Sequence, residues 1–447
     1  MNRLADFALP GFFLAVLATV WASERVVRED QPPGPVRITY WEKWTGFEGD
    51  AMRKVVDDFN KSQDRIFVQL LTVSNVQNKT MLATSAGIPP DVAGIFSANV
   101  AQFVDDRAVT PLDDFCREAG IGPEDYKPVY WNAVTYRGHV WALPSTPATT
   151  ALHYNTAMMR RVGLDPGRPP RTIEELSEMA DRMVQKGPDG RIRVAGFLPA
   201  EPGWWNWAWG YFFGGKLWDG NDRITANSPE NVRAFEWVQS FPKKYGPNEV
   251  QTFRSGFGNF SSPQNAFMSE KVAMVLQGVW MYNFISMYNP KLEWAAAPFP
   301  HPADRPDLAR TTIAEADVLI IPRGAKHPRE AFEFIRYVNS RKGMETLCLL
   351  QRKNSPLTDV SEEFWRRHPN PHIRLFDSLA ASPNAVGVPK LGIWAEYSAE
   401  LNNAFEEIGL LRKTPKEALD AVTERMQPKL DQYLKRLRLR EQAEAPR

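Results

Sequence analysis

Residues 36–96, VRITYWEKWTGFEGDAMRKVVDDFNKSQDRIFVQLLTVSNVQNKTMLATSAGIPPDVAGIF, decide the fold class of this chain. Short runs rich in β-branched and aromatic side chains predict strands. Longer stretches with apolar side chains three and four residues apart predict helices. The predicted elements are a strand at 36–41, a helix at 48–60, a strand at 66–73, a helix at 76–85 and a strand at 92–96. Strands that alternate with helices predict an α/β fold with a parallel, doubly wound sheet.

The length and composition of the chain narrow the possibilities. A chain of 447 residues exceeds the roughly 250–300 residues that one hydrophobic core usually supports, which predicts two lobes. The hydrophobic fraction of 43% and the charged fraction of 24% are ordinary for a globular protein. The net charge of +1 gives no reason to expect a nucleic acid or an anionic membrane surface as the main partner.

The first 23 residues read as an export signal or a membrane anchor. Residues 7–23 are uncharged and mostly apolar, and Val20-Trp21-Ala22 predicts cleavage before Ser23. The alternative is an uncleaved anchor, although the run is short for a span of about 20 residues. The cleaved signal and the uncleaved anchor both predict a periplasmic or other extracytoplasmic protein. The protein would be free in the first case and tethered to the inner membrane by residues 7–22 in the second. Residues 24–35 are predicted to be a proline-rich linker.

Local sequence signals mark the starts of later helices. Thr172, followed by Glu175, forms a capping box. Ser228-Pro229 and Ser262-Pro263 each place an N-cap residue before a proline, which predicts two further helices.

The chain has two cysteines, Cys116 and Cys348. An exported protein permits a disulfide between them, but two buried thiols are the favoured prediction.

Residues 201–215, EPGWWNWAWGYFFGG, form an unusually dense aromatic run. Its four tryptophans cannot all lie on one face of a helix or strand, so some are predicted to line a cleft or a partner surface. A flat indole ring suits the C–H face of a sugar ring, and neighbouring polar side chains could pair with its hydroxyls. The run therefore predicts carbohydrate binding, with packing in a core as the alternative. The residues predicted to contact the ligand are Glu201, Trp204, Trp205 and Trp207.

Short motifs follow one another along the chain in a fixed order. They include Ile38-Thr39-Tyr40-Trp41, Pro89-Pro90-Asp91-Val92, Leu152-His153-Tyr154-Asn155, Phe213-Gly214-Gly215-Lys216, Gly278-Val279-Trp280 and Ile321-Pro322-Arg323-Gly324. In this order and spacing, the chain from about residue 36 to about residue 430 resembles the family 1 extracellular solute-binding proteins of ABC importers, the group that includes maltose-binding protein.

The resemblance implies a two-lobed periplasmic-binding-protein-like fold of type II, with a hinge between the lobes. It implies that a mono- or oligosaccharide binds in an aromatic-lined cleft between the lobes and is delivered to transmembrane permease subunits. The carbohydrate and the ABC permease are thus the expected partners of a monomeric protein. The implied division is a first lobe of residues 36–146 and 299–343, a second of residues 147–298 and 344–435, and a C-terminal tail of residues 436–447.

The resemblance also assigns ligand-site residues outside the aromatic run. They are Trp280 and Trp394, at the positions of sugar-stacking tryptophans, Ser97 and Asn99, at a polar contact, and Trp41 and Trp44, where contacts from the first lobe begin. Each of these tryptophans could instead pack in a core.

The chain departs from the family pattern at Ala314-Glu315-Ala316-Asp317, where many relatives carry a Gly-Gly pair. Two acids spaced two apart on a strand share one face. Glu315 and Asp317 are therefore predicted either to bind hydroxyls or a cationic group in the cleft, or to lie as charges on its rim.

The sequence predicts no metal, no cofactor and no enzyme activity. His368 and His372 lie in a loop with two prolines, unlike the helix-borne pairs that bind metals, and Gly256-Phe257-Gly258 lacks the third glycine of a dinucleotide motif. Two alternatives remain open. One is a glycoside-processing enzyme, which would need two carboxyls such as Glu201 and Glu315 across the scissile bond. The other is a membrane-anchored sugar sensor that uses the same cleft.

Overall fold

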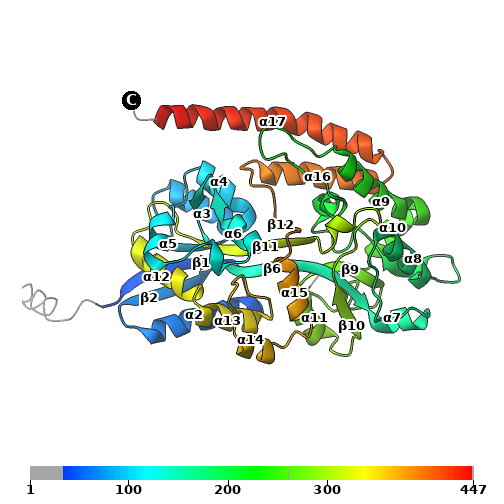
Figure 1. The fold of residues 1–447 in the computed structure, drawn as a ribbon, viewed down its shortest axis with the longest axis horizontal. Helices are drawn as coiled ribbons and strands as arrows, with labels where there is room; N and C mark the ends of the chain where they lie inside the picture. The colour runs from blue at the N-terminus through cyan, green and yellow to red at the C-terminus, as the bar shows by residue number, and fades with distance from the viewer. Residues whose placement is uncertain (1–33, 260, 445–447) are drawn as a thin grey trace, which may run out of the picture.

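The computed structural model describes residues 34–259 and 261–444 (Figure 1). The predicted signal or anchor at 1–23 lies outside the described residues, as does most of the predicted linker. Among the residues described, none of the helices combines the length and apolarity that crossing a membrane requires.

The N-terminal segment folds as its sequence pattern predicts. Its elements are β1 (Val36–Glu42), α2 (Gly46–Ser62), β2 (Ile66–Thr72), α3 (Val76–Ser85) and β3 (Val92–Phe96). β1 pairs in parallel with both β2 and β3, which confirms the parallel sheet predicted for this part of the chain. Buried Ala51, Met52, Val55 and Val56 give α2 its apolar face.

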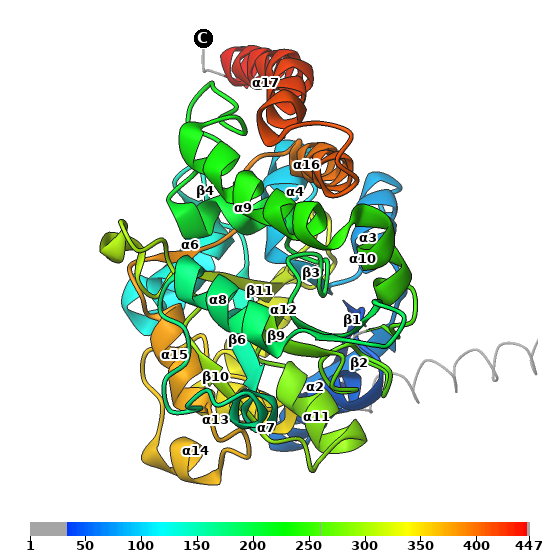
Figure 2. The same cartoon turned by 90° about the vertical axis from the view of Figure 1, so that its right-hand side faces the viewer.

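Ten strands of the described chain form one sheet whose centre is antiparallel. The order is β2-β1-β3-β11-β6-β9-β8-β7, with β10 on β6 and β12 on β11. Their remaining bounds are β6 (Leu143–Asn155), β7 (Gln185–Lys186), β8 (Ile192–Phe197), β9 (Val272–Gly278), β10 (Trp294–Ala297), β11 (Thr312–Ile320) and β12 (Ala385–Val386). Residues 143–149 of β6 pair with β11, and residues 150–154 pair with β9. β6 therefore runs from one half of the molecule into the other, as Figures 1 and 2 show.

Helices cover both faces of the sheet, and a small hairpin of β4 (Thr135–Tyr136) and β5 (His139–Val140) stands apart from it. The α-helices not yet given are α4 (Val100–Asp105), α5 (Asp113–Ala119), α6 (Pro128–Val134), α7 (Thr156–Arg161), α8 (Ile173–Met183), α9 (Pro229–Tyr245), α10 (Pro247–Arg254), α11 (Met281–Tyr288), α12 (Pro328–Val338), α13 (Arg341–Gln351), α14 (Glu362–Arg367), α15 (Ile373–Ala380), α16 (Trp394–Gly409) and α17 (Pro415–Glu444). The 3-10 helices are η1 (Ser97–Asn99), η2 (Pro123–Asp125), η3 (Asn206–Phe213) and η4 (Pro306–Leu308).

The predicted helix starts are right in two cases and wrong in one. The capping box at Thr172 opens α8, and Ser228 caps α9. No helix begins at Ser262, because the chain there makes consecutive turns. The Ser262 hydroxyl accepts from the backbone N–H of Gln264, two residues on, instead of three. A serine hydroxyl that satisfies a turn in this way no longer serves as a helix cap.

Two large hydrophobic cores lie on either side of the central strands. One gathers side chains of β1, β2, α2 and α12, and the other gathers β8, β9, η3, α16 and α17. Met344 and Leu347 of α13 pack in the first of these cores, although residues from 344 onward were predicted in the second lobe. Cys116 and Cys348 are buried free thiols, as favoured.

Helix α17 lies across both halves of the molecule (Figure 1). Residues 436–444, predicted as part of a tail, continue this helix. Leu419 and Leu430 pack in the core of the second half, whereas the Tyr433 hydroxyl donates to the buried Asp105 carboxylate at the end of α4. Arg440 Nη1 donates to the Asp105 carbonyl at 2.6 Å. The helix thus ties the first half to the second.

We expect Tyr433→Phe to reduce the free energy of unfolding by about 1–3 kcal/mol, because it removes the hydroxyl that donates to the buried carboxylate of Asp105. Urea unfolding measures the change. Tyr288→Phe is the matched control, because Tyr288 is 38% exposed on α11. Equal stabilities of the two variants would contradict the tie between α17 and α4.

Candidate ligand-binding site

The residues that follow β1 form a charged network with β11. The Trp44 indole donates from Nε1 to Asp317 Oδ2 at 2.6 Å. Lys43 Nζ lies 3.1 Å from Asp317 Oδ1 and 3.3 Å from Glu42 Oε1. Glu42 in turn accepts a hydrogen bond from the hydroxyl of Tyr40. Because hydrogen bonds to charged groups are the strong ones, this network fixes the orientation of the Trp44 ring against β11.

Three tryptophans of the second half lie together at the end of β9. The ring centroids of Trp204 and Trp280 are 5.6 Å apart, those of Trp205 and Trp280 are 5.9 Å apart, and those of Trp204 and Trp205 are 5.6 Å apart. A Cβ at Gly278 would lie 2.2 Å from the Trp280 ring, so only glycine lets that indole fold back over the strand end. Ring pairs at such separations add about 0.5–1.5 kcal/mol each beyond area burial.

Lys353, just after α13, joins these indoles to Trp44. Its Nζ lies 5.7 Å from the centroid of the Trp44 ring and 5.8 Å from that of Trp280, within the range of cation–π attraction. It also pairs with Glu48 at 2.5 Å. Indoles from both halves therefore face one ammonium group. We call Trp44, Trp204, Trp205 and Trp280 the tryptophan cluster.

Trp207 and Trp394 form a separate pair. Their rings meet edge to face with centroids 4.9 Å apart, and Trp207 also lies 6.1 Å from Tyr211. Both indoles belong to the core of the second half, where they are 6% and 7% exposed. Most of their surface therefore packs against protein, and their contact with a ligand stays a prediction.

The remaining residues predicted from the first half lie near the strand ends. Trp41 follows Tyr40 and precedes Glu42 on β1, so alternation places it on the opposite face from the charged network. Ser97 Oγ accepts from the backbone N–H of Ala316 at 3.5 Å, and Asn99 ends the same 3-10 helix, η1.

Glu201 faces a cation rather than an open space. Its Oε1 accepts from Arg254 Nε at 2.7 Å, and Arg254 Nη2 also donates to the Ala200 carbonyl at 2.8 Å. Burial raises the pKa of the Glu201 carboxyl, and the Arg254 guanidinium opposes this rise. The ion pair anchors the turn that precedes the aromatic run.

Glu315 shares a face of β11 with Asp317, as the spacing predicts, but is left unpaired. It lies opposite Ala148 of β6, at the junction of the two halves. Within residues 34–259 and 261–444, no side chain or backbone group hydrogen-bonds or ion-pairs with its carboxyl. Burial, together with the neighbouring Asp317 carboxylate, raises the pKa of Glu315 to about 7. Glu315 also raises the pKa of the buried Tyr211 hydroxyl, a smaller cause than burial itself.

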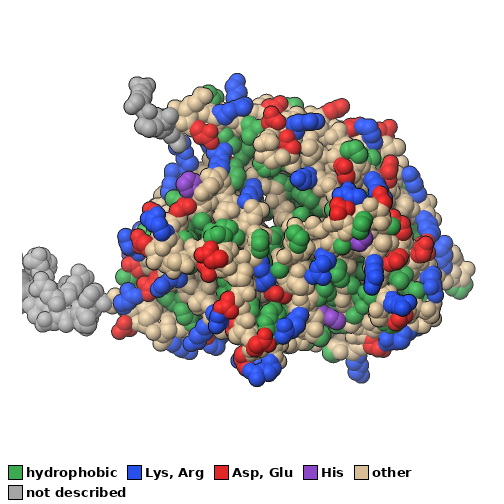
Figure 3. Space-filling model, in the orientation of Figure 1, with side chains coloured by type: hydrophobic (Ala, Val, Ile, Leu, Met, Phe, Trp, Pro, Cys, Tyr) green, Lys and Arg blue, Asp and Glu red, His purple; other side chains and the backbone are tan. Residues whose placement is uncertain are grey.

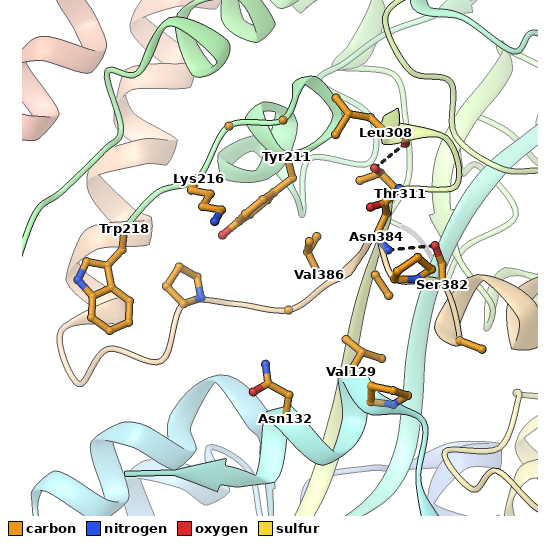
Figure 4. Close-up of a pocket in the computed structure, with 18 residues that line it drawn as sticks. Val129, Asn132, Tyr211, Lys216, Trp218, Leu308, Thr311, Ser382, Asn384 and Val386 are labelled. Carbon is orange, nitrogen blue, oxygen red and sulfur yellow. Dashed lines mark hydrogen bonds between the residues drawn. The ribbon is translucent and has the colours of Figure 1, made fainter. Parts of the chain in front are cut away.

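A pocket of about 740 Å³ opens between the two halves and contains none of the residues predicted from the sequence. Asn132 and Val129 of α6 line one side, and Tyr211, Lys216 and Trp218 line the other (Figure 4). The space-filling view shows a hollow between the halves below α17 (Figure 3). α6 packs on the face of β11 that carries Ala314 and Ala316, whereas Tyr211, across the pocket, lies near enough to Glu315 for that carboxyl to raise the pKa of its hydroxyl.

Three residues in or near the candidate site were not predicted from the sequence, namely Lys43, Tyr211 and Lys353. Lys43 stands between Trp41 and Trp44 in the first motif, and Tyr211 lies inside the aromatic run. Lys353 has no local signal at all, because only the fold brings it to Trp44, far away along the chain.

Comparison with known proteins identifies the family. The sequence profile of the bacterial extracellular solute-binding proteins matches residues 47–345, well over half of the chain. The chain belongs to this family. The sn-glycerol-3-phosphate-binding periplasmic protein UgpB of Escherichia coli O1:K1 is 23% identical over 419 residues, which cover 87% of this chain and 91% of UgpB.

Solved structures of other solute-binding proteins share the fold. CpMnBP1 with mannobiose bound has a TM-score of 0.76 and 25% identity, covering 87% of this chain and 99% of that chain. The sugar-binding protein MalE of Xanthomonas citri has a TM-score of 0.73 and 18% identity, covering 91% of this chain and all of MalE, 100%. The predicted family and two-lobed α/β fold are confirmed, and so is the general role of an extracytoplasmic solute-binding protein.

In this solute-binding protein we expect Glu315→Gln to be stabilising, and increasingly so as the pH rises. The folded-state pKa of about 7 lies above the ordinary value of 4.5, so the folded protein keeps a proton that the unfolded chain releases between these values. The penalty for ionising Glu315 therefore grows as the pH rises through this interval and is complete above it. At about pH 8 the variant should be more stable by about 2 kcal/mol, and the gain should shrink toward about pH 5.

Urea unfolding of the wild type and variant at both pH values measures this gain. Glu236→Gln, at an exposed carboxyl on α9, is the matched control and should show no such trend. A gain in stability that is the same at both pH values would contradict the raised pKa of Glu315.

Proposed function

We propose that this solute-binding protein captures a carbohydrate, a mono- or oligosaccharide, between its two halves and delivers it to the permease subunits of an ABC importer. The observation that carries the proposal is the tryptophan cluster, in which indoles from both halves meet around Lys353. Flat indoles offer the apolar surface that a sugar ring needs, and Glu315 and Asp317 offer acceptors for its hydroxyls. CpMnBP1, which shares the fold, was solved with mannobiose bound, and MalE, which also shares it, is called a sugar-binding protein.

The proposed mechanism is closure of one half on the other. We assign residues 36–146 and 299–343 to the first lobe and residues 147–298 and 344–435 to the second. The packing of Met344 and Leu347 favours moving α13 to the first lobe. β6 and β11 run between the halves and would act as hinge strands. A sugar held on the Trp280 side would then be covered by Trp44. Trp41, Ser97, Asn99, Trp207 and Trp394 remain proposed contacts around this centre.

A second candidate ligand is sn-glycerol 3-phosphate, which the name of the curated relative UgpB gives for that protein. A phosphate needs cations that are free to pair with it. Lys43 and Lys353 at the tryptophan cluster are already paired with carboxylates. We therefore favour the carbohydrate.

We propose binding rather than catalysis. A glycosidase needs two carboxyls that both face the scissile bond, whereas Glu201 is held by Arg254. Incubating the protein with each saccharide that it binds and analysing the products by chromatography tests this. Release of a shorter sugar would favour the glycoside-processing alternative.

We expect purified protein to show a rise in melting temperature and a change in tryptophan fluorescence with at least one member of a saccharide panel. The panel is mannobiose, mannotriose, maltotetraose and tagatose. Trp280→Ala should weaken binding of that saccharide by about 10-fold, because it removes a stacking surface worth about 1.4 kcal/mol. Calorimetric titration measures the affinity.

The control for this prediction is Trp131→Ala, which removes a partly buried indole on α6 that stacks on Tyr126 and shares no hydrophobic cluster with Trp280. It should leave the affinity unchanged. The same loss of affinity in both variants, or no binding of any saccharide, would contradict the proposed site.

The N-terminal segment generates a separate prediction. If residues 1–22 act as a cleaved signal, then protein recovered from the periplasm of an expressing bacterium begins at Ser23 by mass spectrometry. An intact N-terminus in the membrane fraction would instead support the tether and the sensor alternative.

A further inference from the structure

At or beside the tryptophan cluster, at least one carboxylate pairs with each of Lys43, Lys353 and Arg254. Lys43 contacts the carboxylates of Glu42 and Asp317, and Lys353 contacts that of Glu48. Three carboxylates therefore face two ammonium groups. Arg254, beside the turn that leads into Trp204, is bound by Glu201. No positive charge of this network is left over for a ligand.

Glu315 adds a carboxyl that nothing in the described chain neutralises. It lies two residues from Asp317 on the same face of β11, and the Asp317 carboxylate is already bound by Trp44 and Lys43. Glu315 is only partly covered, in contrast to Asp317, which is 6% exposed. A ligand that touches Trp44 and Asp317 therefore meets the Glu315 carboxyl as well.

We infer that Glu315 acts as a charge filter that restricts the site to uncharged polyhydroxylated ligands and excludes phosphate esters. The inference rests on the proposed function, since it assumes that the ligand lies at the tryptophan cluster. It goes beyond that function because it names the feature of the ligand, its charge, on which selection depends.

The physical reason is that an unpaired carboxylate accepts hydrogen bonds from hydroxyls but repels anions. A sugar hydroxyl donates to it in a bond of the stronger, charge-assisted kind. At about pH 8, above the pKa of about 7 of Glu315 and the second pKa of a phosphate ester, about 6, both groups are ionised, so the phosphate has no proton to donate and is repelled. This repulsion is larger in a partly buried site than in water, because the effective dielectric constant is lower. Building in repulsion is a common way to discriminate between ligands of similar size.

The experiment compares wild-type protein with Glu315→Gln, which keeps the shape of the side chain and removes its charge. The probes are mannotriose, maltotetraose and sn-glycerol 3-phosphate, titrated calorimetrically at pH 8 in low and in high salt. We expect the wild type to bind a saccharide and to bind the phosphate ester only weakly. We expect Glu315→Gln to gain affinity for sn-glycerol 3-phosphate by about 10-fold or more, with a smaller gain in high salt. Glu236→Gln should match the wild type.

The outcomes separate this inference from the proposed function. A wild type that binds a saccharide, together with a variant that gains no affinity for the phosphate ester, overturns the charge filter alone. Binding of the phosphate ester by the wild type and no binding of any saccharide overturns both. Lys390, outside the tryptophan cluster, is a second place where a phosphate ester can bind. Its Nζ donates to Asn132 Oδ1 and to the Thr135 carbonyl, and no carboxylate among the described residues pairs with it. Phosphate-ester binding that is lost in Lys390→Met would place the anion there and overturn the filter.

Discussion

The antiparallel pairing of β6 with β11 is the constraint on which the site depends. β6 pairs with β11 over residues 143–149 and with β9 over residues 150–154, so a single strand links the two halves. Side chains alternate along a strand, and the register therefore decides which residues of β11 face Trp44. Asp317 reaches both Lys43 and the Trp44 indole because of that register. A shift by one residue would present Ala316 and Val318 instead.

Charge pairing then decides how the loop after β1 is held. Burial alone would lower the pKa of Lys43, but the adjacent Asp317 and Glu42 carboxylates raise it above its ordinary value. The ammonium therefore stays charged, and replacing Lys43 by a neutral residue would leave the buried Glu42 and Asp317 carboxylates without their cation, which is strongly destabilising. Lys353 and Glu48 form a second close ion pair, and removing either side chain would leave the other without its partner. These pairs place indoles from distant parts of the chain on either side of one ammonium group.

Residues whose role depends on local pattern could be predicted from the sequence. The strand and helix order of residues 36–96 follows from periodicity, and the start of α8 follows from a capping box. Trp280 could be assigned because it belongs to a motif. Lys353 could not, since its partners lie far away along the chain. The turn at Ser262 was mistaken for a helix start because the same hydroxyl can cap a helix or satisfy a turn.

The aromatic run shows the limit of composition as evidence. The argument that one face cannot hold every tryptophan is correct, but a core can receive indoles from several directions. Trp209 is 2% exposed and Trp207 is 6% exposed, because η3 is surrounded by α9, α16 and β8. Composition therefore predicts that aromatic rings gather in this part of the molecule, and only packing decides which of them remain available to a ligand.

The contacts within the tryptophan cluster set a condition on ligand affinity. Trp204, Trp205 and Trp280 pack against one another, so a sugar ring gains only the difference between its own stacking and the indole contacts that it replaces. The net affinity is what remains of the ligand contacts after the free energy of the replaced contacts is subtracted. Hydroxyl acceptors on β11 therefore matter more than the number of indoles suggests. Glu315, whose carboxyl pairs with no group of residues 34–259 and 261–444, can accept from a ligand hydroxyl without first giving up a contact within the protein.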